Sequence, residues 1–357
     1  MNSRERVHNT LYREKTDRVP VNYGANPGID LQLKQHFGLR SDDHEGLRQA
    51  LGVDLRGAGA PYIGKRLHPE VPERQVDLQF GWRTRWVEHG AGGYWDFCDF
   101  PLKKADEETV ANWPMPSADD YDYEILIDYC RENQEYGMHV GNPGLACVMN
   151  TAGFFRSMDQ MFIDLALDDP AGLLLIDRFL KLQLEKVERE LEKVSVYIEF
   201  MWLGEDLGTQ DSPMISMDMF QHHILPRQKP FIELAKSYNI PVMIHTCGSS
   251  SWSYEEYIKA GITAFDTLQP ECHNMNPEYL TEHYGTRASF HGGISTTNEL
   301  SFGSVEDVEN QVKHTLDIMM PYKGYFLSPA HSIQDNSPLE NVLAMYEAGR
   351  KYGQYDY

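Results

Sequence analysis

The sequence predicts an α/β protein built as a (β/α)8 TIM barrel, and two observations favour that fold class. Short apolar runs alternate with helical patterns at intervals of roughly 25–50 residues, which is typical of βαβ units. About eight such runs fit into the 357 residues of the chain, the usual scale of this barrel. No glycine-rich phosphate fingerprint opens a predicted helix, so a dinucleotide-binding sheet is disfavoured. We expect residues 1–357 to form one domain.

Apolar runs bounded by proline, glycine or polar residues place the expected strands at 19–24, 196–202, 240–245, 264–268, 288–290 and 325–328. Two further runs, 139–142 and 146–150, lie between the helix expected at 123–136 and the one at 168–194, and Asn150 stands at the end of the second. Periodic segments place the expected helices at 3–13 (with Ser3 as N-cap), 28–50, 123–136, 168–194, 217–238, 253–261, 277–284, 305–319 and 339–352. Residues 76–101 interrupt the alternation with aromatic runs around Gly-Ala-Gly-Gly, which predicts an inserted β-hairpin. This hairpin either shapes the mouth of the barrel or forms a contact in a homodimer, and the sequence leaves both open.

The composition excludes several classes of function. A net charge of −22 would repel the phosphates of nucleic acids. No apolar run approaches ~20 residues and the first residues lead into no signal-peptide core, so we expect neither a membrane span nor secretion. The five cysteines are scattered and odd in number, which indicates a reducing cytoplasm without a disulfide framework. These features favour a cytoplasmic protein that acts on small molecules or meets a protein partner.

The stretch 240–248, Ile-Pro-Val-Met-Ile-His-Thr-Cys-Gly, carries the strongest chemical signal. Its apolar part is typical of a buried parallel strand, and His245 and Cys247 follow at the carboxyl end. Alternate residues of an extended segment point the same way, so the imidazole and the thiol face one space. An α/β enzyme holds a metal ion at such a place. The plainer interpretation of a lone His-x-Cys is a cysteine that only packs.

Polar residues also gather at the carboxyl ends of the other expected strands, where barrels place their active sites. The candidates are Tyr23, Asn150, Glu205, Asp206, Cys272, His273, His291 and His331. Zinc takes about four ligands from cysteine, histidine and carboxylate, and a catalytic site keeps one position open. We therefore expect His245, Cys247 and His331 to bind Zn²⁺.

The carboxylates at this edge have more than one interpretation. Glu205 is either a fourth metal ligand or a proton donor, and Asp206 either acts directly or anchors the loop that follows it. Cys272 and His273 form a rival ligand pair, and the sequence leaves open whether Glu205 or Cys272 completes the site. We expect four further side chains to bind substrate, with core packing as the alternative for the aromatic ones: Tyr23, Asn150, Trp202 and His291.

Several motifs resemble the uroporphyrinogen decarboxylase superfamily. They are Ser-Arg-Glu-Arg-Val at 3–7, Asp-Arg-Val-Pro-Val at 17–21, the run at 241–248, His-Gly-Gly-Ile at 291–294, and Pro-Ala-His-Ser-Ile at 329–333 with Glu-Asn-Val at 340–342. Their order matches the family over nearly the whole chain. The resemblance implies a (β/α)8 barrel.

The motifs also indicate a branch of this superfamily. Its decarboxylases carry an arginine-bearing segment after the first strand that grips porphyrinogen carboxylates, whereas residues 21–27 contain no arginine. His-x-Cys-Gly at 245–248 is instead similar to the zinc-dependent, corrinoid-linked methyltransferases. Thiol-methylating members have a second cysteine where this chain has His331, which disfavours thiol methylation. Residues 204–208 and 212–216 resemble the branch that demethylates methoxylated aromatics.

The resemblance therefore implies a zinc-dependent methyltransferase. It would move a methyl group from a methoxylated, aromatic small molecule to the cob(I)alamin carried by a separate corrinoid protein, with Zn²⁺ stabilising the leaving oxygen. Three alternatives stay open. They are a metal-free decarboxylase that uses Asp206 or His331 to handle the proton, a methylcobalamin:thiol methyltransferase, and a non-catalytic carrier of a methylated ligand or corrinoid partner.

Overall fold

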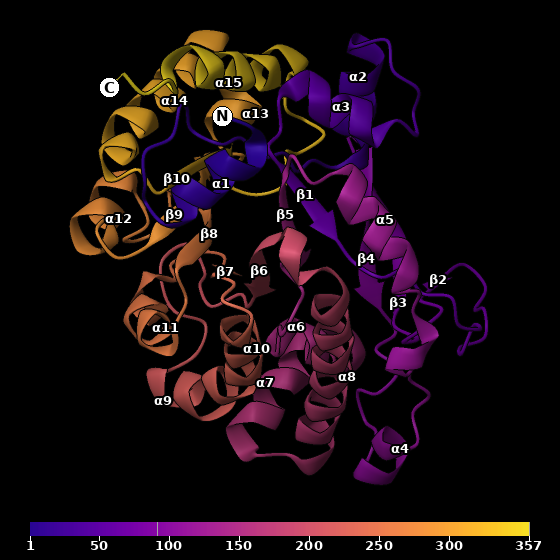
Figure 1. Cartoon of the computed structure of the whole chain (residues 1–357). Coiled ribbons are helices and arrows are strands. Elements are labelled where there is room, and N and C mark those ends of the chain that lie inside the picture. Colours follow the sequence, from indigo (N-terminus) through magenta and orange to yellow (C-terminus); the bar gives the residue numbers. More distant parts are fainter. Residues whose placement is uncertain (91, 357) are drawn as a thin grey trace.

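The computed structural model describes residues 1–90 and 92–356, and its centre is a curled parallel sheet (Figure 1). The seven strands of this sheet within the described residues are, in chain order and in spatial order, β1 (Leu55–Ala58), β5 (Gly137–Gly141), β6 (Ile198–Gly204), β7 (Val242–His245), β8 (Ala264–Leu268), β9 (Ser289–Ile294) and β10 (Tyr325–Pro329). Neighbouring strands pair in parallel throughout. The fold is α/β and TIM-barrel-like, as predicted, but the described residues form seven strands of this sheet instead of the eight expected for a (β/α)8 barrel.

The strands form because their sequences are nearly continuous apolar runs. β6 reads Ile-Glu-Phe-Met-Trp-Leu-Gly and is buried at every position, as expected for a parallel strand covered on both faces. Successive residues of the strands belong to different cores: Phe200 and Met243 pack together with Val7, whereas Met201 and Ile244 pack in the larger cluster shared with the helices. The curled sheet therefore separates two buried layers.

Helices follow the strands along the chain and surround the sheet (Figure 1). Their bounds are α1 (Ser3–Leu11), α2 (Pro27–His36), α3 (His44–Leu51), α4 (Glu107–Ala111), α5 (Glu124–Glu132), α6 (Met149–Arg156), α7 (Met158–Leu167), α8 (Pro170–Val194), α9 (Met217–Met219), α10 (Leu225–Ser237), α11 (Tyr254–Ala260), α12 (Pro277–Tyr284), α13 (Glu299–Phe302), α14 (Val305–Met319) and α15 (Leu339–Tyr352). A π-helical segment, η3 (Phe220–Ile224), connects α9 to α10. Local sequence explains the longest helix, because Asp169 caps the start of α8 and Pro170 occupies its first position.

An extended segment links β1 and β10, the two edges of the sheet. Val21 forms a parallel bridge with Leu327 of β10, and its carbonyl accepts a hydrogen bond from the backbone N–H of Asp54, the residue before β1 (2.9 Å). The sequence predicted a strand at 19–24. The segment makes isolated bridges instead of a regular ladder, in line with Pro20, which has no backbone N–H to donate.

Asp54 holds this junction together and is fully buried. Its carboxylate accepts hydrogen bonds from the guanidinium groups of Arg6 (2.8 Å) and Arg18 (2.8 and 2.9 Å). It also accepts from the Ser3 hydroxyl (2.7 Å) and the backbone N–H of Val21 (2.8 Å). One buried carboxylate therefore ties α1, the segment 19–25 and β1 to one another.

Residues 76–101 include a small antiparallel sheet beside the barrel. It consists, within the described residues, of β2 (Gln75–Val76), β3 (Arg83–His89) and β4 (Gly92–Cys98). The predicted glycine turn includes residue 91, which lies outside the described residues. Phe97 of β4 stacks on Phe154 of α6 with ring centroids 3.8 Å apart, so aromatic packing attaches this sheet to the barrel.

Some local predictions were wrong. β1 was not among the expected strands, because Arg56 interrupts its apolar pattern. The guanidinium of Arg56 is buried and pairs with Glu45 (2.8 Å). The single helix expected at 28–50 is two helices, with Gly38 in the left-handed region (φ 67°) after the first. The N-cap of α1 is Asn2, not Ser3. Asn150, expected at a strand end, lies in the first turn of α6.

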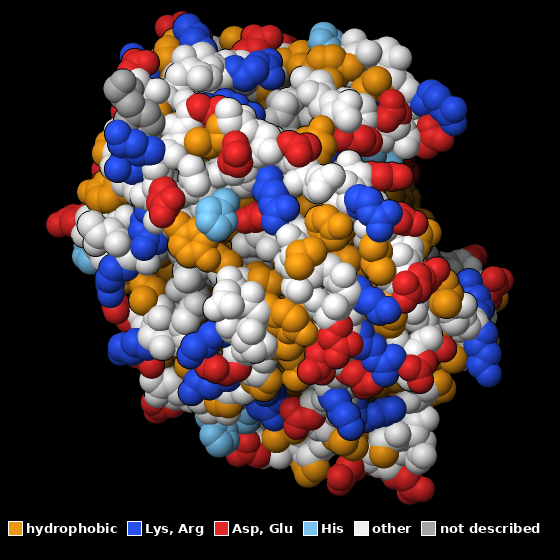
Figure 2. Space-filling view, in the orientation of Figure 1, with side chains coloured by type: hydrophobic (Ala, Val, Ile, Leu, Met, Phe, Trp, Pro, Cys, Tyr) orange, Lys and Arg blue, Asp and Glu red, His pale blue; other side chains and the backbone are white. Residues whose placement is uncertain are grey.

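The exposed face in Figure 2 has acidic and basic side chains interspersed. Within the described residues, no helix has both the length and the apolar character that a membrane crossing requires.

We expect Asp54→Asn to lower the free energy of unfolding by about 3 kcal/mol, because it removes the charge that two arginines share in a buried place. Urea unfolding measures the loss. The matched control is Asp42→Asn, whose exposed pair with Arg40 should contribute less than about 1 kcal/mol. Equal small effects of the two substitutions would contradict the role assigned to Asp54.

Candidate metal centre and cavity

Asp266 of β8 organises the polar groups at the carboxyl ends of the strands. Its side chain is buried, and the register aligns it with His245 of β7 on one side and His291 of β9 on the other. Its two carboxylate oxygens contact the Nδ1 atoms of these histidines, at 2.6 Å for His245 and 2.5 Å for His291. Both imidazoles are thereby oriented so that their Nε2 atoms point away from Asp266.

The Nε2 atom of His245 meets a thiol and a second carboxylate. Cys247 Sγ lies 3.1 Å from it, and Asp206 Oδ1 lies 3.6 Å from it. The three ligand atoms all lie within 4.8 Å of one another. The side-chain amide of Asn150, at the start of α6, donates to the other oxygen of Asp206 (2.8 Å) and fixes its direction. The structure therefore brings together residues that follow β6 and β7.

The protonation of this cluster follows from its close charges. Burial alone would lower the pKa of His245, but Cys247, Asp266 and Asp206 together raise it well above its usual value. Burial would raise the pKa of Asp206, but its hydrogen bond to His245 and the attraction between them hold that pKa well below the ordinary range. Burial raises the pKa of the Cys247 thiol, although His245 opposes the shift. The cluster thus attracts positive charge.

The donor set fits a zinc ion. One nitrogen, one sulfur and one oxygen atom converge, and these are the ligand types that zinc accepts. The carboxylate of Asp266 behind His245 is the outer partner that metal-binding histidines usually have, because it orients the ring and raises its basicity. All three candidate ligands are partly exposed, so an ion can reach them from solvent.

The other predicted ligands lie outside this compact group. The ring of His331 is near, with its centroid 6.4 Å from that of His245. Glu205 is completely buried and accepts hydrogen bonds from the backbone N–H groups of Val148 (2.6 Å) and Met149 (3.1 Å) at the start of α6. Cys272 is also buried and belongs to the hydrophobic core.

A cavity of about 500 Å³ adjoins the cluster. It is lined by Asn22, Tyr23, Gly24, Arg48, Leu55, Gly57, His139, Pro143, Trp202, His245, Asp266, Thr267, His291, Ser328, Pro329, His331 and Ser332. Three of the four residues expected to bind substrate are among them. Asn150 is the exception, since it contacts Asp206 instead. Trp202 is notable because its buried indole N–H has no hydrogen-bond partner within the part of the chain that the structure describes.

A second cavity of about 440 Å³ lies beside the ends of β1 and β5. Phe80 and Trp82, from the excursion at 76–101, contribute to its wall together with Phe154 and Phe179. The excursion therefore helps to form a cavity at this edge of the barrel.

Sequence reasoning missed three residues of the site: Asp266, His139 and Arg48. A lone aspartate inside the apolar run at 264–268 was the available signal for Asp266, because a buried acid requires partners. His139 lies in β5, stacks on Phe200 and approaches Trp202 edge-on. Arg48 lies in α3, far in the sequence from the barrel motifs, so nothing near it indicated that it lines the cavity.

The fold and the site together define a class: a TIM-barrel-like protein with a polar, metal-compatible cluster at the carboxyl ends of its parallel strands. Residues 208–352 match the family model described as uroporphyrinogen decarboxylase (URO-D). The matched residues include His245, Cys247, Asp266, His291 and His331. The resemblance indicated by the motifs is confirmed there.

Solved structures support the fold assignment. A methyltransferase from Methanosarcina mazei matches with a TM-score of 0.63 and 17% sequence identity, and the match covers 99% of each chain. At that identity the match shows a shared fold. An uncharacterised protein matches 48% of this chain and 45% of its own length at 11% identity, but its TM-score of 0.27 is too low to support an argument. No curated protein matches the chain.

His139 should make the fold sensitive to acid. Burial lowers its pKa to about 4, whereas an unfolded histidine titrates near about 6.5. As the pH falls through this window, the unfolded chain gains a proton that the folded chain does not, so stability is lost. Between pH 7.5 and 5 the loss should be about 2 kcal/mol.

The test compares urea unfolding of the wild type and His139→Gln at both pH values. The variant can keep a donor toward the carbonyl of Gly141 and should lose about 2 kcal/mol less on acidification. The pH-dependent loss is calculated separately for each protein, so any change in stability that the substitution causes through packing cancels. An equal loss in both proteins would show that His139 is not responsible.

Proposed function

We propose that this chain is a zinc-dependent methyltransferase that moves a methyl group from a methoxylated aromatic molecule to the cob(I)alamin of a separate corrinoid protein. The observation that carries the proposal is the convergence of Asp206, Cys247 and the Nε2 atom of His245 beside a cavity. The URO-D domain and the fold shared with a methyltransferase are compatible with it. We also propose that residues 1–357 form one domain in which the segment 19–25 takes the place of the eighth strand of the barrel.

Asp206, His245 and Cys247 would hold the zinc ion. His331, which lies close to His245, would be the fourth ligand. Zinc there would supply Lewis acidity toward the ether oxygen, so that it leaves as a phenolate with its charge stabilised. Asp266 is a positioning residue in this scheme, because it contacts the far side of the His245 ring.

Glu205 has a supporting role in this proposal. Its carboxylate accepts from two backbone N–H groups at the start of α6, and burial raises its pKa to about 8. It therefore holds the loop that positions Asn150, which in turn orients Asp206. Of the two carboxylates after β6, Asp206 is the one that faces the candidate ligands.

The cavity suits a flat methyl donor that carries a hydrogen-bond acceptor. His139 and His291 each make an edge-on aromatic contact with Trp202 at its wall, which favours an aromatic ring. The pKa of His139 is lowered by burial, so its ring is neutral near pH 7. The unpartnered N–H of Trp202 would donate to an oxygen of the bound molecule, which relieves a buried donor.

One observation favours the decarboxylase alternative. Arg48 lines the same cavity and supplies a cation that could pair with a substrate carboxylate. In that reaction Asp206 or His331 would handle the proton without a metal. The metal measurement below separates the two functions.

Purified, untagged protein should contain zinc, and Cys247→Ala should lose the equivalent bound at this cluster, because the thiol is one of its three ligand atoms. Plasma mass spectrometry measures the metal. Substitution with cobalt should also produce a thiolate-to-metal charge-transfer band that disappears in this variant.

The matched control is Cys272→Ala, which removes a buried thiol and tests the rival ligand. It should keep both the metal and the band. If no metal is bound by the wild type, or if only Cys272→Ala loses it, the proposed centre is wrong, and absence of metal would favour decarboxylation.

Trp202→Phe should raise the KM for a methoxylated aromatic donor about fivefold to tenfold, the cost of one lost hydrogen bond. Zinc content should stay at the wild-type level, because the indole is not a ligand. The assay follows methylation of reduced cobalamin. An unchanged KM would remove Trp202 from the substrate contacts.

A further inference from the structure

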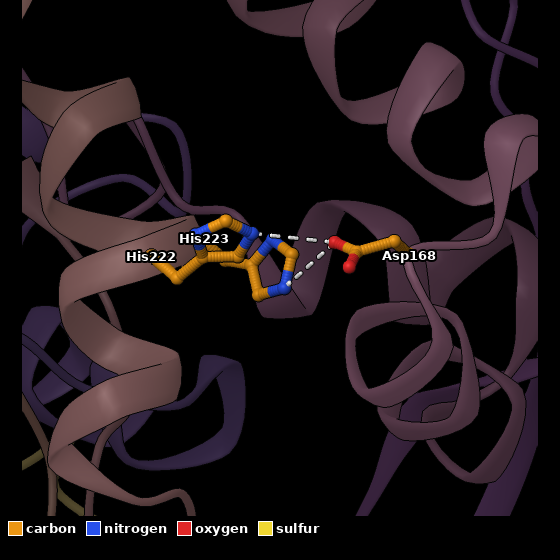
Figure 3. A group of neighbouring side chains, drawn as sticks. All are labelled: Asp168, His222 and His223. Atoms are coloured by element: carbon orange, nitrogen blue, oxygen red, sulfur yellow. Dashed lines mark ion pairs between the residues drawn. The ribbon is translucent and has the colours of Figure 1, made fainter.

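A second group of metal-ligand side chains lies on the outer helices. Asp168 stands in the turn between α7 and α8, and His222 and His223 are consecutive residues of η3 (Figure 3). Both imidazoles point toward the carboxylate from the facing element. The Nε2 atoms of His222 and His223 lie 3.4 and 3.5 Å from the same oxygen, Asp168 Oδ1.

These distances fit a shared ion better than hydrogen bonds. Charge-assisted N–H···O bonds are about 2.7–2.9 Å long, which is shorter than either contact. Ligand atoms that each lie about 2.0 Å from a tetrahedral ion are about 3.3 Å apart. The three ligand atoms here all lie within 4.8 Å of one another. The two N···O distances, 3.4 and 3.5 Å, are therefore close to those expected between ligand atoms of such a site.

The backbone explains how two neighbouring histidines reach one point. In an α-helix, consecutive side chains diverge by about 100° because 3.6 residues make one turn. Residues Phe220–Ile224 form a π-helical segment, a rare conformation that often occurs at functional sites. The two rings meet edge to face, with centroids 4.5 Å apart. Asp168 has a left-handed backbone (φ 53°) at the end of α7.

The surroundings hold the site while leaving it accessible. His223 is buried, so its ring has little room to move. Asp168 and His222 are largely exposed, at 62% and 68% of their side chains, so an ion can enter from solvent. The nearby cation Arg227 is paired with Asp177 (2.7 Å) and also donates to the carbonyl of His223.

We propose that Asp168, His222 and His223 form a second metal site, which binds a divalent transition metal such as zinc through two imidazoles and one carboxylate. Imidazole ligands favour such ions over magnesium or calcium, which prefer oxygen. An ion held there joins the α7–α8 turn to the segment between α9 and α10, so it stabilises the packing of the outer helices. This inference does not depend on the proposed methyltransferase activity.

The test measures zinc binding by equilibrium dialysis on untagged, metal-stripped, full-length protein. Four proteins are compared: wild type, His222→Ala, Cys247→Ala and the variant with both substitutions. We expect His222→Ala to bind one equivalent fewer than the wild type, or to bind it at least tenfold more weakly, and Cys247→Ala to keep that equivalent. Zinc at about 100 times its dissociation constant should raise the Tm of Cys247→Ala by about 4 °C. The double variant should not respond.

The matched control is His314→Ala, which removes another exposed histidine paired with a carboxylate, Glu278 (2.9 Å). It should bind zinc as the wild type does. Asp168→Asn, a second exposed change, should weaken the same equivalent as His222→Ala. Identical zinc binding by the wild type, His222→Ala and Asp168→Asn would overturn the proposal. Absence of the thiolate band from the cobalt-substituted wild type, together with a retained His222-dependent equivalent, would overturn only the barrel-end centre.

Discussion

The candidate site depends on one buried carboxylate that two strands share. Asp266 is almost completely buried, and a charge in such a place is tolerated only when it is paired and hydrogen-bonded. His245 and His291 meet that requirement from the two neighbouring strands. Because the pairing needs all three residues at one level of the sheet, a register slip of one residue on either side would leave the charge unpaired. The strand register and the orientation of the site therefore follow from the same constraint.

That constraint extends outward through a chain of contacts. Once Asp266 holds Nδ1, the Nε2 atom of His245 faces Cys247 and Asp206. Asp206 is in turn held by Asn150 at the start of α6. Glu205 anchors this end of the helix by accepting a hydrogen bond from the backbone N–H of Met149. The site is thus supported by strands and by one helix terminus, and elements of that kind hold side chains more precisely than free loops. On the other side, His291 contacts Asn22 (3.0 Å), which connects the same carboxylate to the segment that links the sheet edges.

The sequence was sufficient to predict a TIM-barrel-like α/β fold and to single out two members of the polar cluster at the strand ends, because both depend on strong local patterns. Apolar runs gave most of the parallel strands within a few residues, and His245 and Cys247 stood at the end of one of them. β1 was not predictable, since its buried arginine is stabilised by Glu45 on a helix that pattern analysis cannot place beside it. Asp266 and Arg48 were missed for a similar reason. Asp266 acts through pairing across the sheet, and Arg48 reaches the cavity from a helix. The spacing of residues along the sequence indicates neither arrangement.

Glu205 and Asp206 are neighbours in the sequence, but their side chains lie in different environments. They follow the same strand, and successive residues of an extended chain point to opposite sides. Glu205 therefore turns inward, where burial raises its pKa to about 8 and backbone N–H groups occupy its oxygens. Asp206 turns toward His245, which holds its pKa well below the ordinary range. Two carboxylates next to each other thus have different proton affinities and different partners. In the proposed reaction only Asp206 can hold an ion. Glu205 keeps the start of α6 in place, and Asn150 on that helix orients Asp206.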